Sequence, residues 1–237
     1  MKEKADGCTV NPQNVYPGDC EFIEYLHKKS AARTEKSASL SPSDPPSEKV
    51  SDCCKLSAPL SRDELLQKAQ KIKLLLLDVD GVLTNGSITY THQGEEIKSF
   101  HCRDGFGINI LKKAGVEVGI ITARQSEALL RRAKDLSLTH VYQGVRNKVS
   151  CFSQLLEKLK LEPSEIAFMG DDWLDLPLLT RVGLAAAVAD CAPELKGSVH
   201  FISSHNGGTG AVRELCDLII EAKGLRESLL NEYHNRQ

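Results

Sequence analysis

Acidic, basic and hydroxyl side chains follow four short apolar segments of the sequence. Phosphoryl transfer requires this mixture: one carboxylate can attack phosphorus, a second acid can move protons, and hydroxyl and ammonium groups can bind the phosphoryl oxygens. Carboxylate oxygens are also ligands that Mg²⁺ prefers. In chain order the residues are Asp78 and Asp80; Thr122 and Arg124; Lys148; and Asp171, Asp172 and Asp175.

Each of these residues also has an ordinary structural interpretation. An acid after a strand, such as Asp78, often caps a helix, and Thr122 alone suits the same role. Lys148 alone suits a solvated surface, and Asp172 and Asp175 are favourable charges for the first turn of a helix. All four strand ends carry the required groups in one order, so we favour a shared phosphoryl-transfer site.

Apolar, strand-like segments alternate with helical patterns from residue 61 onward, where Ser61 and Glu64 match a capping box that starts a short helix. This alternation predicts an α/β fold with a doubly wound parallel sheet, in which ligands bind beyond the carboxyl ends of the strands. The predicted strands are 72–77, 116–121, 140–142, 166–169 and 184–188, and the predicted helices are 107–114, 126–136, 148–159, 172–182 and 210–222.

One segment interrupts the alternation directly after the first strand. Residues 88–91 and 97–100 suit the two strands of a β-hairpin, with Gly94 in the turn. An isolated hairpin is only marginally stable, so we expect it to pack on something else, such as another subunit.

Composition divides the chain near residue 62. Twelve of the twenty-five residues from 37 to 61 are Ser or Pro, and such a segment buries too little apolar surface to offset its ordering entropy. We therefore expect a flexible N-terminal extension over residues 1–62 and one domain over residues 63–237.

The remaining composition excludes several classes of partner. A net charge of −2 gives no reason to expect nucleic acid or a membrane surface as a partner, and no apolar run reaches the length of a membrane helix. The N-terminus lacks a signal-peptide pattern, so we expect a cytoplasmic protein whose eight cysteines are mostly free thiols.

The residues at the strand ends resemble the four motifs of haloacid dehalogenase superfamily phosphatases. Within that superfamily, residues 71–224 resemble the 3-deoxy-D-manno-octulosonate 8-phosphate (Kdo 8-phosphate) phosphatases, whose product is used in lipopolysaccharide synthesis. The resemblance implies a Rossmann-like fold in which a β-hairpin stands in place of a large cap domain. The supporting segments are 85–86, 94–96, 103–108, 142–144, 182–184, 189–193 and 207–214.

The resemblance also implies a role for each motif residue. Asp78 would be the nucleophile and Asp80 the general acid and base. Mg²⁺ would be held by Asp78, the backbone carbonyl of Asp80, and Asp171. Thr122 and Lys148 would bind the phosphate, while Asp172 and Asp175 would support the metal and Lys148.

Substrate contacts and assembly are implied in the same way. The substrate would be a small acidic sugar phosphate, and the family forms homotetramers in which the hairpins build a central barrel. Two departures weaken the substrate assignment: Thr209, where relatives often have a basic residue, and Ala123, where they have a glycine. The implied substrate-binding residues are Asp80, His101, Cys102, Arg103, Asp104, Gly105, Asn109, Arg124, Arg132 and Lys148.

Two alternatives remain open at the level of sequence. The substrate could be another acidic sugar phosphate, such as 2-keto-3-deoxynononate 9-phosphate. A non-catalytic scaffold is the other alternative, but Asp78, Asp80, Lys148 and Asp171 are all present. Residues 225–237 suit either a helix or a tail that closes a neighbouring subunit's site.

Overall fold

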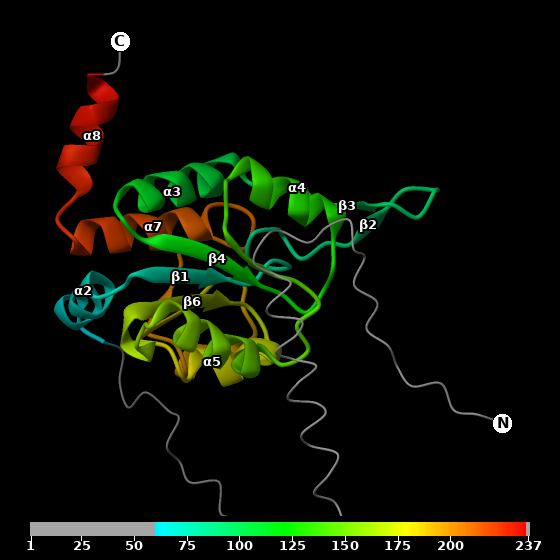
Figure 1. Cartoon of the computed structure of the whole chain (residues 1–237), viewed down its shortest axis with the longest axis horizontal. Helices are drawn as coiled ribbons and strands as arrows, with labels where there is room; N and C mark the ends of the chain where they lie inside the picture. The colour runs from blue at the N-terminus through cyan, green and yellow to red at the C-terminus, as the bar shows by residue number, and fades with distance from the viewer. Residues whose placement is uncertain (1–59, 236–237) are drawn as a thin grey trace, which may run out of the picture. The chain divides into compact units, whose positions relative to one another are not determined.

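Six parallel strands form the central sheet of the computed structural model, which describes residues 60–235 (Figure 1). They lie in the order β5-β4-β1-β6-β7-β8, which confirms the predicted α/β class with a doubly wound parallel sheet. The strands are β1 (Leu74–Leu77), β4 (Glu117–Ile121), β5 (His140–Tyr142), β6 (Ile166–Gly170), β7 (Leu184–Ala187) and β8 (Phe201–Ile202).

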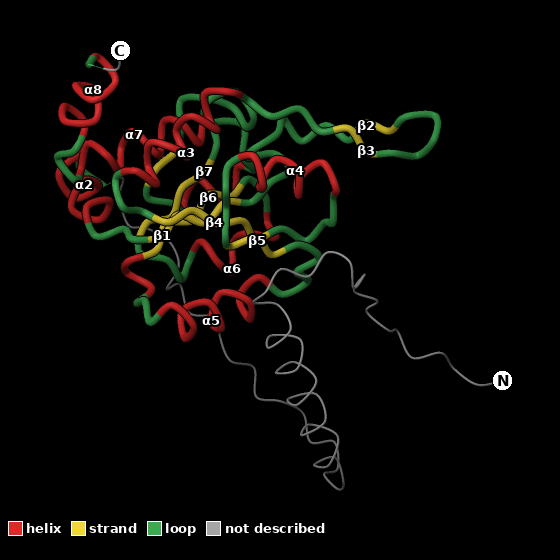
Figure 2. Tube along the Cα trace, turned by 45° about the horizontal axis from the view of Figure 1, so that its top comes forward, coloured by secondary structure: helices red, strands yellow, loops and turns green. Residues whose placement is uncertain are grey.

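Helices cover both faces of this sheet. One face carries α3 (Cys102–Lys113), α4 (Glu127–Asp135) and α7 (Ala211–Ala222), and the other carries α5 (Lys148–Leu159) and α6 (Leu176–Leu179) (Figures 1 and 2). All four leucines of β1 are buried, as expected of a strand with helices on both sides. The shorter helices α2 (Arg62–Gln70) and α8 (Arg226–His234) contact α7.

Local capping explains where several helices begin. The predicted capping box is present: Ser61 Oγ accepts a hydrogen bond from the Glu64 N–H, and the Glu64 carboxylate accepts one from the Ser61 N–H. Ser126 caps α4 and Asn147 caps α5 in the same way, by accepting a hydrogen bond from the backbone three residues on.

Two predicted helices were wrong in their extent. Helix α3 begins at Cys102 rather than at residue 107, and its first turns include Gly105 and Gly107. A Cβ on Gly107 would lie 2.9 Å from the Arg213 side chain of α7, so a glycine there permits close packing of α3 on α7. The predicted helix 172–182 is instead a 3₁₀ turn at Trp173–Asp175 followed by the single turn α6.

The predicted hairpin is present but short. Strands β2 (Thr89–Tyr90) and β3 (Glu96–Ile97) pair antiparallel, and Gly94 takes the positive φ of 85° that its turn requires. The hairpin extends away from the rest of the described structure (Figure 2). Three of its apolar side chains are exposed: Ile88, Tyr90 and Ile97.

Some expectations fall outside the described residues. Of the predicted extension, residues 1–62, only the last three are described, so the proposed domain boundary stays a prediction. Four of the eight cysteines lie in residues 1–59. Within residues 60–235, Cys102, Cys151, Cys191 and Cys216 are free thiols, and no helix there has the length and apolar character to cross a membrane.

Candidate active site

The four predicted motifs lie at the carboxyl ends of four adjacent strands, β5, β4, β1 and β6. Asp78 follows β1, Thr122 follows β4, Lys148 opens α5 shortly after β5, and Asp171 follows β6. Because carboxyl ends of parallel strands meet at one edge of the sheet, these loops converge there.

An acidic cluster lies at the centre of this edge. One oxygen each from Asp78, Asp171 and Asp175 can be chosen so that all three lie within 4.8 Å of one another. The ammonium of Lys148 lies 2.9 Å from Asp78 Oδ1 and 2.7 Å from Asp175 Oδ1. The Lys148 and Asp175 side chains are almost fully buried, 7% and 1% exposed, so these charges interact with little screening by water.

The charges in this cluster do not balance. Burial raises the pKa of Asp171 to about 7, and the negative charges of Asp175 and Asp78 add to the effect. Burial likewise raises the pKa of Asp78 to about 6, assisted by Asp175 and opposed by Lys148. Burial alone would lower the pKa of Lys148, but the two carboxylates beside it raise it. Three carboxylates therefore share one ammonium.

A divalent cation fits this imbalance. Asp78 Oδ1 is buried, and the ammonium of Lys148, which lies 2.9 Å from it, is shared with Asp175 at 2.7 Å. A buried cluster of carboxylates with excess negative charge is what a hard cation such as Mg²⁺ binds. Asp78 and Asp171 are the carboxylates that could hold it.

Asp175 and Asp172 have different environments. Asp175 Oδ2 accepts a hydrogen bond from the Asp171 N–H at 3.0 Å, while its other oxygen bonds Lys148. Asp175 therefore fixes both a candidate metal ligand and the buried ammonium. Asp172 is exposed, and its carboxylate caps the Trp173 N–H at 2.7 Å. Asp172 is therefore the N-cap of the 3₁₀ turn, one residue before the first-turn position of the ordinary structural interpretation.

Gly81 permits the close approach of the Asp171 carboxylate. Its φ is +88°, and a Cβ built on it would lie 2.0 Å from Asp171 Oδ2. The loop that contains it turns sharply, because the N–H groups of Val82, Leu83 and Thr84 all donate to the Val79 carbonyl. The extended backbone that we expected to align the Asp78 and Asp80 side chains therefore ends before Asp80.

As a result, Asp80 has different partners from Asp78. One Asp80 oxygen contacts the ammonium of Lys98, which follows β3, and the other lies 3.4 Å from Arg124 Nε. Glu96 joins these two cations, at 2.6 Å from Arg124 Nη2 and 3.4 Å from Lys98 Nζ. Tyr90 and Glu96 accept hydrogen bonds from Arg124 and raise its pKa, so the guanidinium stays charged.

No role of Lys98 or Glu96 was predicted from the sequence. A signal was available, because residues 96 and 98 of an extended strand point to one side and Ile97 to the other. An acid and a base on the same side of a hairpin at the mouth of a site could have been considered together. Which side faced the site was not determined by the sequence.

Thr122 and Arg132 are held near the site by backbone contacts. Thr122 is buried, and its Oγ1 accepts a hydrogen bond from the Arg124 N–H at 3.3 Å, so the hydroxyl proton can be donated elsewhere. Arg132 donates to the His101 carbonyl at 3.4 Å and lies over the Phe100 ring. This places Arg132 against the start of α3.

The other predicted substrate-binding residues are spread over the first turns of α3. Cys102, Arg103 and Asn109 are exposed. Asp104 is buried and accepts a hydrogen bond from the Arg213 N–H at 2.8 Å, so it holds the start of α7. His101 precedes the helix, and Gly105 packs against Arg132. No contact within the described residues joins Arg103 or Asn109 to the acidic cluster.

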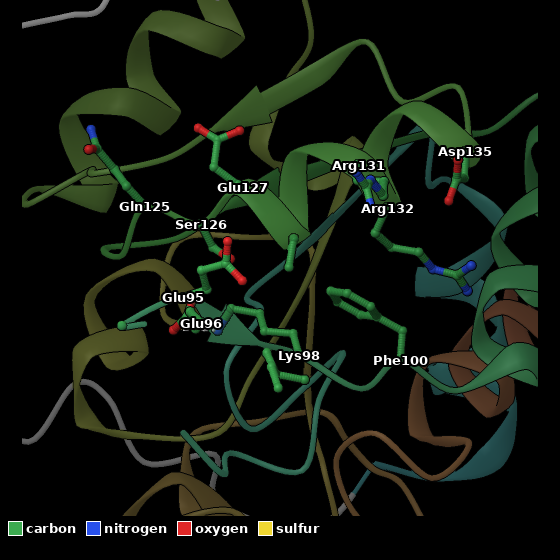
Figure 3. A pocket seen from close by; sticks show the side chains of 13 residues that line it. Glu95, Glu96, Lys98, Phe100, Gln125, Ser126, Glu127, Arg131, Arg132 and Asp135 are labelled. Atoms are coloured by element: carbon green, nitrogen blue, oxygen red, sulfur yellow. Dashed lines mark ion pairs between the residues drawn. The ribbon is translucent and has the colours of Figure 1, made fainter. Parts of the chain in front are cut away.

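A cavity of about 860 Å³ lies between the hairpin and α4 (Figure 3). Its wall includes Lys98, which contacts Asp80, and Glu96, which lies 3.4 Å from Lys98. It also includes Arg132, which lies over the Phe100 ring. The cavity is therefore next to Asp80, the general acid candidate, and its lining does not include Asp78, the nucleophile candidate. The lining residues are 94–98, Phe100, 125–128, Arg131, Arg132 and Asp135.

Comparisons with known proteins agree with this geometry. A model of the haloacid dehalogenase-like hydrolase family matches residues 138–215. The curated 3-deoxy-D-manno-octulosonate 8-phosphate phosphatase of Escherichia coli (strain K12) is 46% identical over 166 residues, which are 70% of this chain and 88% of that protein.

Solved structures with the same description are similar throughout the domain. The Yersinia pestis phosphatase has a TM-score of 0.69 and 44% identity, covering 70% of this chain and 89% of that one. The Moraxella catarrhalis phosphatase, in complex with a magnesium ion, a phosphate ion and a KDO molecule, has a TM-score of 0.71 and 37% identity, covering 72% and 98%. With this identity and coverage, the chain belongs to the 3-deoxy-D-manno-octulosonate 8-phosphate phosphatase family of haloacid dehalogenase-like hydrolases.

Proposed function

We propose that this chain hydrolyses Kdo 8-phosphate to Kdo and inorganic phosphate in a Mg²⁺-dependent reaction. The observation that carries the proposal is the buried cluster of Asp78, Asp171, Asp175 and Lys148 at the carboxyl edge of the sheet. Relatives that match this chain over most of their own length are phosphatases for this substrate, and one is described with magnesium, phosphate and KDO.

The reaction proceeds in two displacements at phosphorus. A carboxylate oxygen of Asp78 attacks the phosphorus, and the bond from phosphorus to the sugar oxygen breaks. Asp80 donates a proton to that departing oxygen, which leaves as the sugar hydroxyl. Asp80 then takes a proton from a water molecule as the water attacks the phosphorus, which releases phosphate and regenerates the Asp78 carboxylate.

Lys148 and Thr122 bind the phosphoryl oxygens during both displacements. Lys148 is held in place by Asp175, and it supplies a buried positive charge beside the nucleophile. When bound by Asp78, Asp171 and the Asp80 carbonyl, Mg²⁺ supplies further charge neutralisation to the phosphoryl group.

An acidic sugar is selected by guanidinium groups around the mouth of the site. Arg124 lies beside Asp80, and Arg132 lies beside the start of α3 and lines the cavity at the hairpin. A planar guanidinium can grip a carboxylate with two parallel hydrogen bonds. Arg103 is a third candidate, because it is exposed on the first turn of α3.

We also propose the assembly and setting of the enzyme. The exposed apolar side chains of the hairpin support a homotetramer in which hairpins pack together. The free thiols within residues 60–235 support a reducing, cytoplasmic setting. The family resemblance supports a place in lipopolysaccharide sugar synthesis, with residues 63–237 as the catalytic domain and residues 1–62 as an extension.

The direct test is phosphate release from a panel of sugar phosphates, with Mg²⁺ and with chelator. The panel contains Kdo 8-phosphate, 2-keto-3-deoxynononate 9-phosphate and neutral sugar phosphates. We expect Mg²⁺-dependent preference for Kdo 8-phosphate and loss of turnover in Asp78→Asn. The matched control is Asp63→Asn, an exposed acid on α2, which should retain full activity.

Each other result has a definite meaning. Preference for the nine-carbon substrate would keep the chemistry and replace the substrate. Turnover that survives Asp78→Asn would remove Asp78 as the nucleophile. A folded wild-type protein that hydrolyses no panel member in Mg²⁺ would contradict the proposal and favour the non-catalytic scaffold.

A further inference from the structure

Lys98 has an unusual environment for a lysine on a short, mostly exposed hairpin. Its side chain is 1% exposed although the residue as a whole is half-buried, whereas the residue beside it, Ile97, is exposed. A buried ammonium is costly unless carboxylates surround it. The ammonium contacts one Asp80 oxygen and lies 3.4 Å from Glu96 Oε1. The position of Lys98 therefore depends on Asp80 and Glu96.

The two oxygens of Asp80 face two different cations. Lys98 contacts Oδ1, and Arg124 Nε lies 3.4 Å from Oδ2. Glu96 accepts from Arg124 at 2.6 Å, so it fixes the second cation relative to the first. Three segments thus meet on one carboxylate: the loop after β1, the end of the hairpin and the loop after β4.

This group differs from the acidic cluster in its charge. Asp80 and Glu96 are balanced by Lys98 and Arg124, whereas Asp78, Asp171 and Asp175 face Lys148 alone. A balanced set of ion pairs does not call for a metal. What the contacts provide instead is orientation, because the Lys98 hydrogen bond at Oδ1 and the Arg124 charge 3.4 Å from Oδ2 together oppose rotation of the carboxylate.

We infer that Lys98, with Glu96, is a positioning residue for the general acid Asp80, an inference that rests on the proposed function. Proton donation to the departing sugar oxygen requires the donor to lie within hydrogen-bond reach and correct orientation. The N–H groups of three loop residues after Asp80 donate to the Val79 carbonyl, and the side chain of Asp80 makes its ion pairs with Lys98 and Arg124, outside that loop. The hairpin supplies the missing constraint from outside the loop.

The test compares two leaving groups on the full-length enzyme with Mg²⁺. A sugar alkoxide needs a proton as it departs, whereas the nitrophenolate of p-nitrophenyl phosphate leaves without one. The first-turnover rate of ester cleavage is measured for both, by acid quench for the sugar phosphate and by absorbance for nitrophenolate. This rate precedes hydrolysis of the phosphoaspartate, so the later role of Asp80 as a base does not enter.

Asp80→Asn provides the reference pattern, and Lys98→Met, Lys98→Arg and Glu96→Gln are compared with it. We expect Lys98→Met to slow sugar phosphate cleavage by about tenfold or more while nitrophenolate release stays within about threefold of wild type. Lys98→Arg should restore most of the sugar phosphate rate. Lys112→Met is the control, because it removes a part-buried lysine that bonds the Leu136 and Ser137 carbonyls instead.

Four results would overturn the inference. Equal losses on both substrates would give Lys98 a general structural role, and a rise in KM alone would make it a substrate-binding residue. Unchanged cleavage rates for both substrates would show that Lys98 does not position Asp80. If Lys98→Met does not fold, Glu96→Gln is tested in its place. Equal effects of Glu96→Gln on sugar phosphate cleavage and nitrophenolate release would then contradict the inference. A wild type that is inactive on every ester, or an Asp80→Asn without the reference pattern, would instead contradict the proposed function.

Discussion

Three carboxylates in the acidic cluster compete for one buried ammonium, and the pH dependence of stability follows from this. In the unfolded chain Asp78 and Asp171 lose their protons near their ordinary pKa of 3.8, whereas in the folded, metal-free protein they keep them to about 6 and about 7. Between pH 3.8 and about pH 7 the folded state therefore binds more protons than the unfolded state. The free energy of unfolding therefore falls as pH rises through this range.

Mg²⁺ should reverse that loss, because it binds the deprotonated carboxylates. We expect chelator-treated protein to have a lower melting temperature at pH 8 than at pH 5, and Mg²⁺ to raise it more at pH 8. Thermal unfolding at both pH values, with and without Mg²⁺, measures this. Asp171→Asn should abolish the Mg²⁺ effect and Asp63→Asn should keep it. An equal effect of Mg²⁺ at both pH values would contradict the assignment of these acids.

Gly81 offers a second test at the residue scale. Gly81→Ala would place a Cβ 2.0 Å from Asp171 Oδ2 and should weaken Mg²⁺ binding by about 10- to 100-fold. Gly115→Ala is a matched control, with a similar φ of +81° but no atom within 4 Å. Both variants should lose about 1–3 kcal/mol of stability to backbone strain, so calorimetric titration with Mg²⁺ separates them. Equal affinities in the two variants would argue against Asp171 as a ligand.

The sequence indicated the acidic cluster because its members are chemically distinctive and follow buried strands. It could not indicate the partners of Asp80, since the contact with Lys98 depends on how the hairpin bends back and on the turn after Asp78. The sequence predicts that the hairpin forms, but not how the hairpin is oriented relative to the loop that contains Asp80. Contacts between a loop and a hairpin are set by tertiary packing.

At the scale of elements, five of the six strands of the main sheet were predicted to within two residues, and β8 (Phe201–Ile202) was not predicted. The segment 140–142 matched β5, because a short apolar run between turn residues leaves little choice of boundary. The start of α3 was predicted five residues late, because Gly105 and Gly107 masked a helix in which Gly107 packs against α7 and Gly105 packs against Arg132 of α4. The segment after Asp171 was predicted as one helix, but its capping contacts form a separate 3₁₀ turn first.

The hairpin makes a prediction about assembly. Ile97 is 49% exposed on a two-stranded element with no core of its own, so Ile97→Lys should weaken the proposed tetramer. Ile202→Lys is the matched control, since Ile202 is 41% exposed at β8 on the edge of the main sheet. Light scattering after size-exclusion chromatography measures the mass of both. A tetramer that survives Ile97→Lys, or is lost equally in both variants, would contradict a role for the hairpin in assembly.

At the scale of the whole molecule, residues 60–235 contain a sheet covered on both faces and all of the proposed catalytic groups. Deleting residues 1–59 is therefore expected to leave kcat/KM within about twofold of the full chain. Turnover and native mass of the deletion variant measure this. A large loss of turnover with unchanged mass would assign the extension a part in catalysis, and a change in mass would assign it a part in assembly.

The pairing of β1 with both β4 and β6 has a consequence for synthesis of the chain. β1 (Leu74–Leu77) pairs with β6 (Ile166–Gly170), about ninety residues later in the sequence. Contacts between such distant segments form late, because the intervening chain must first be brought together. A growing chain on the ribosome therefore exposes Asp78 well before Asp171 emerges. Mg²⁺ can stabilise only the finished sheet, so metal binding should report completion of folding rather than guide its early steps.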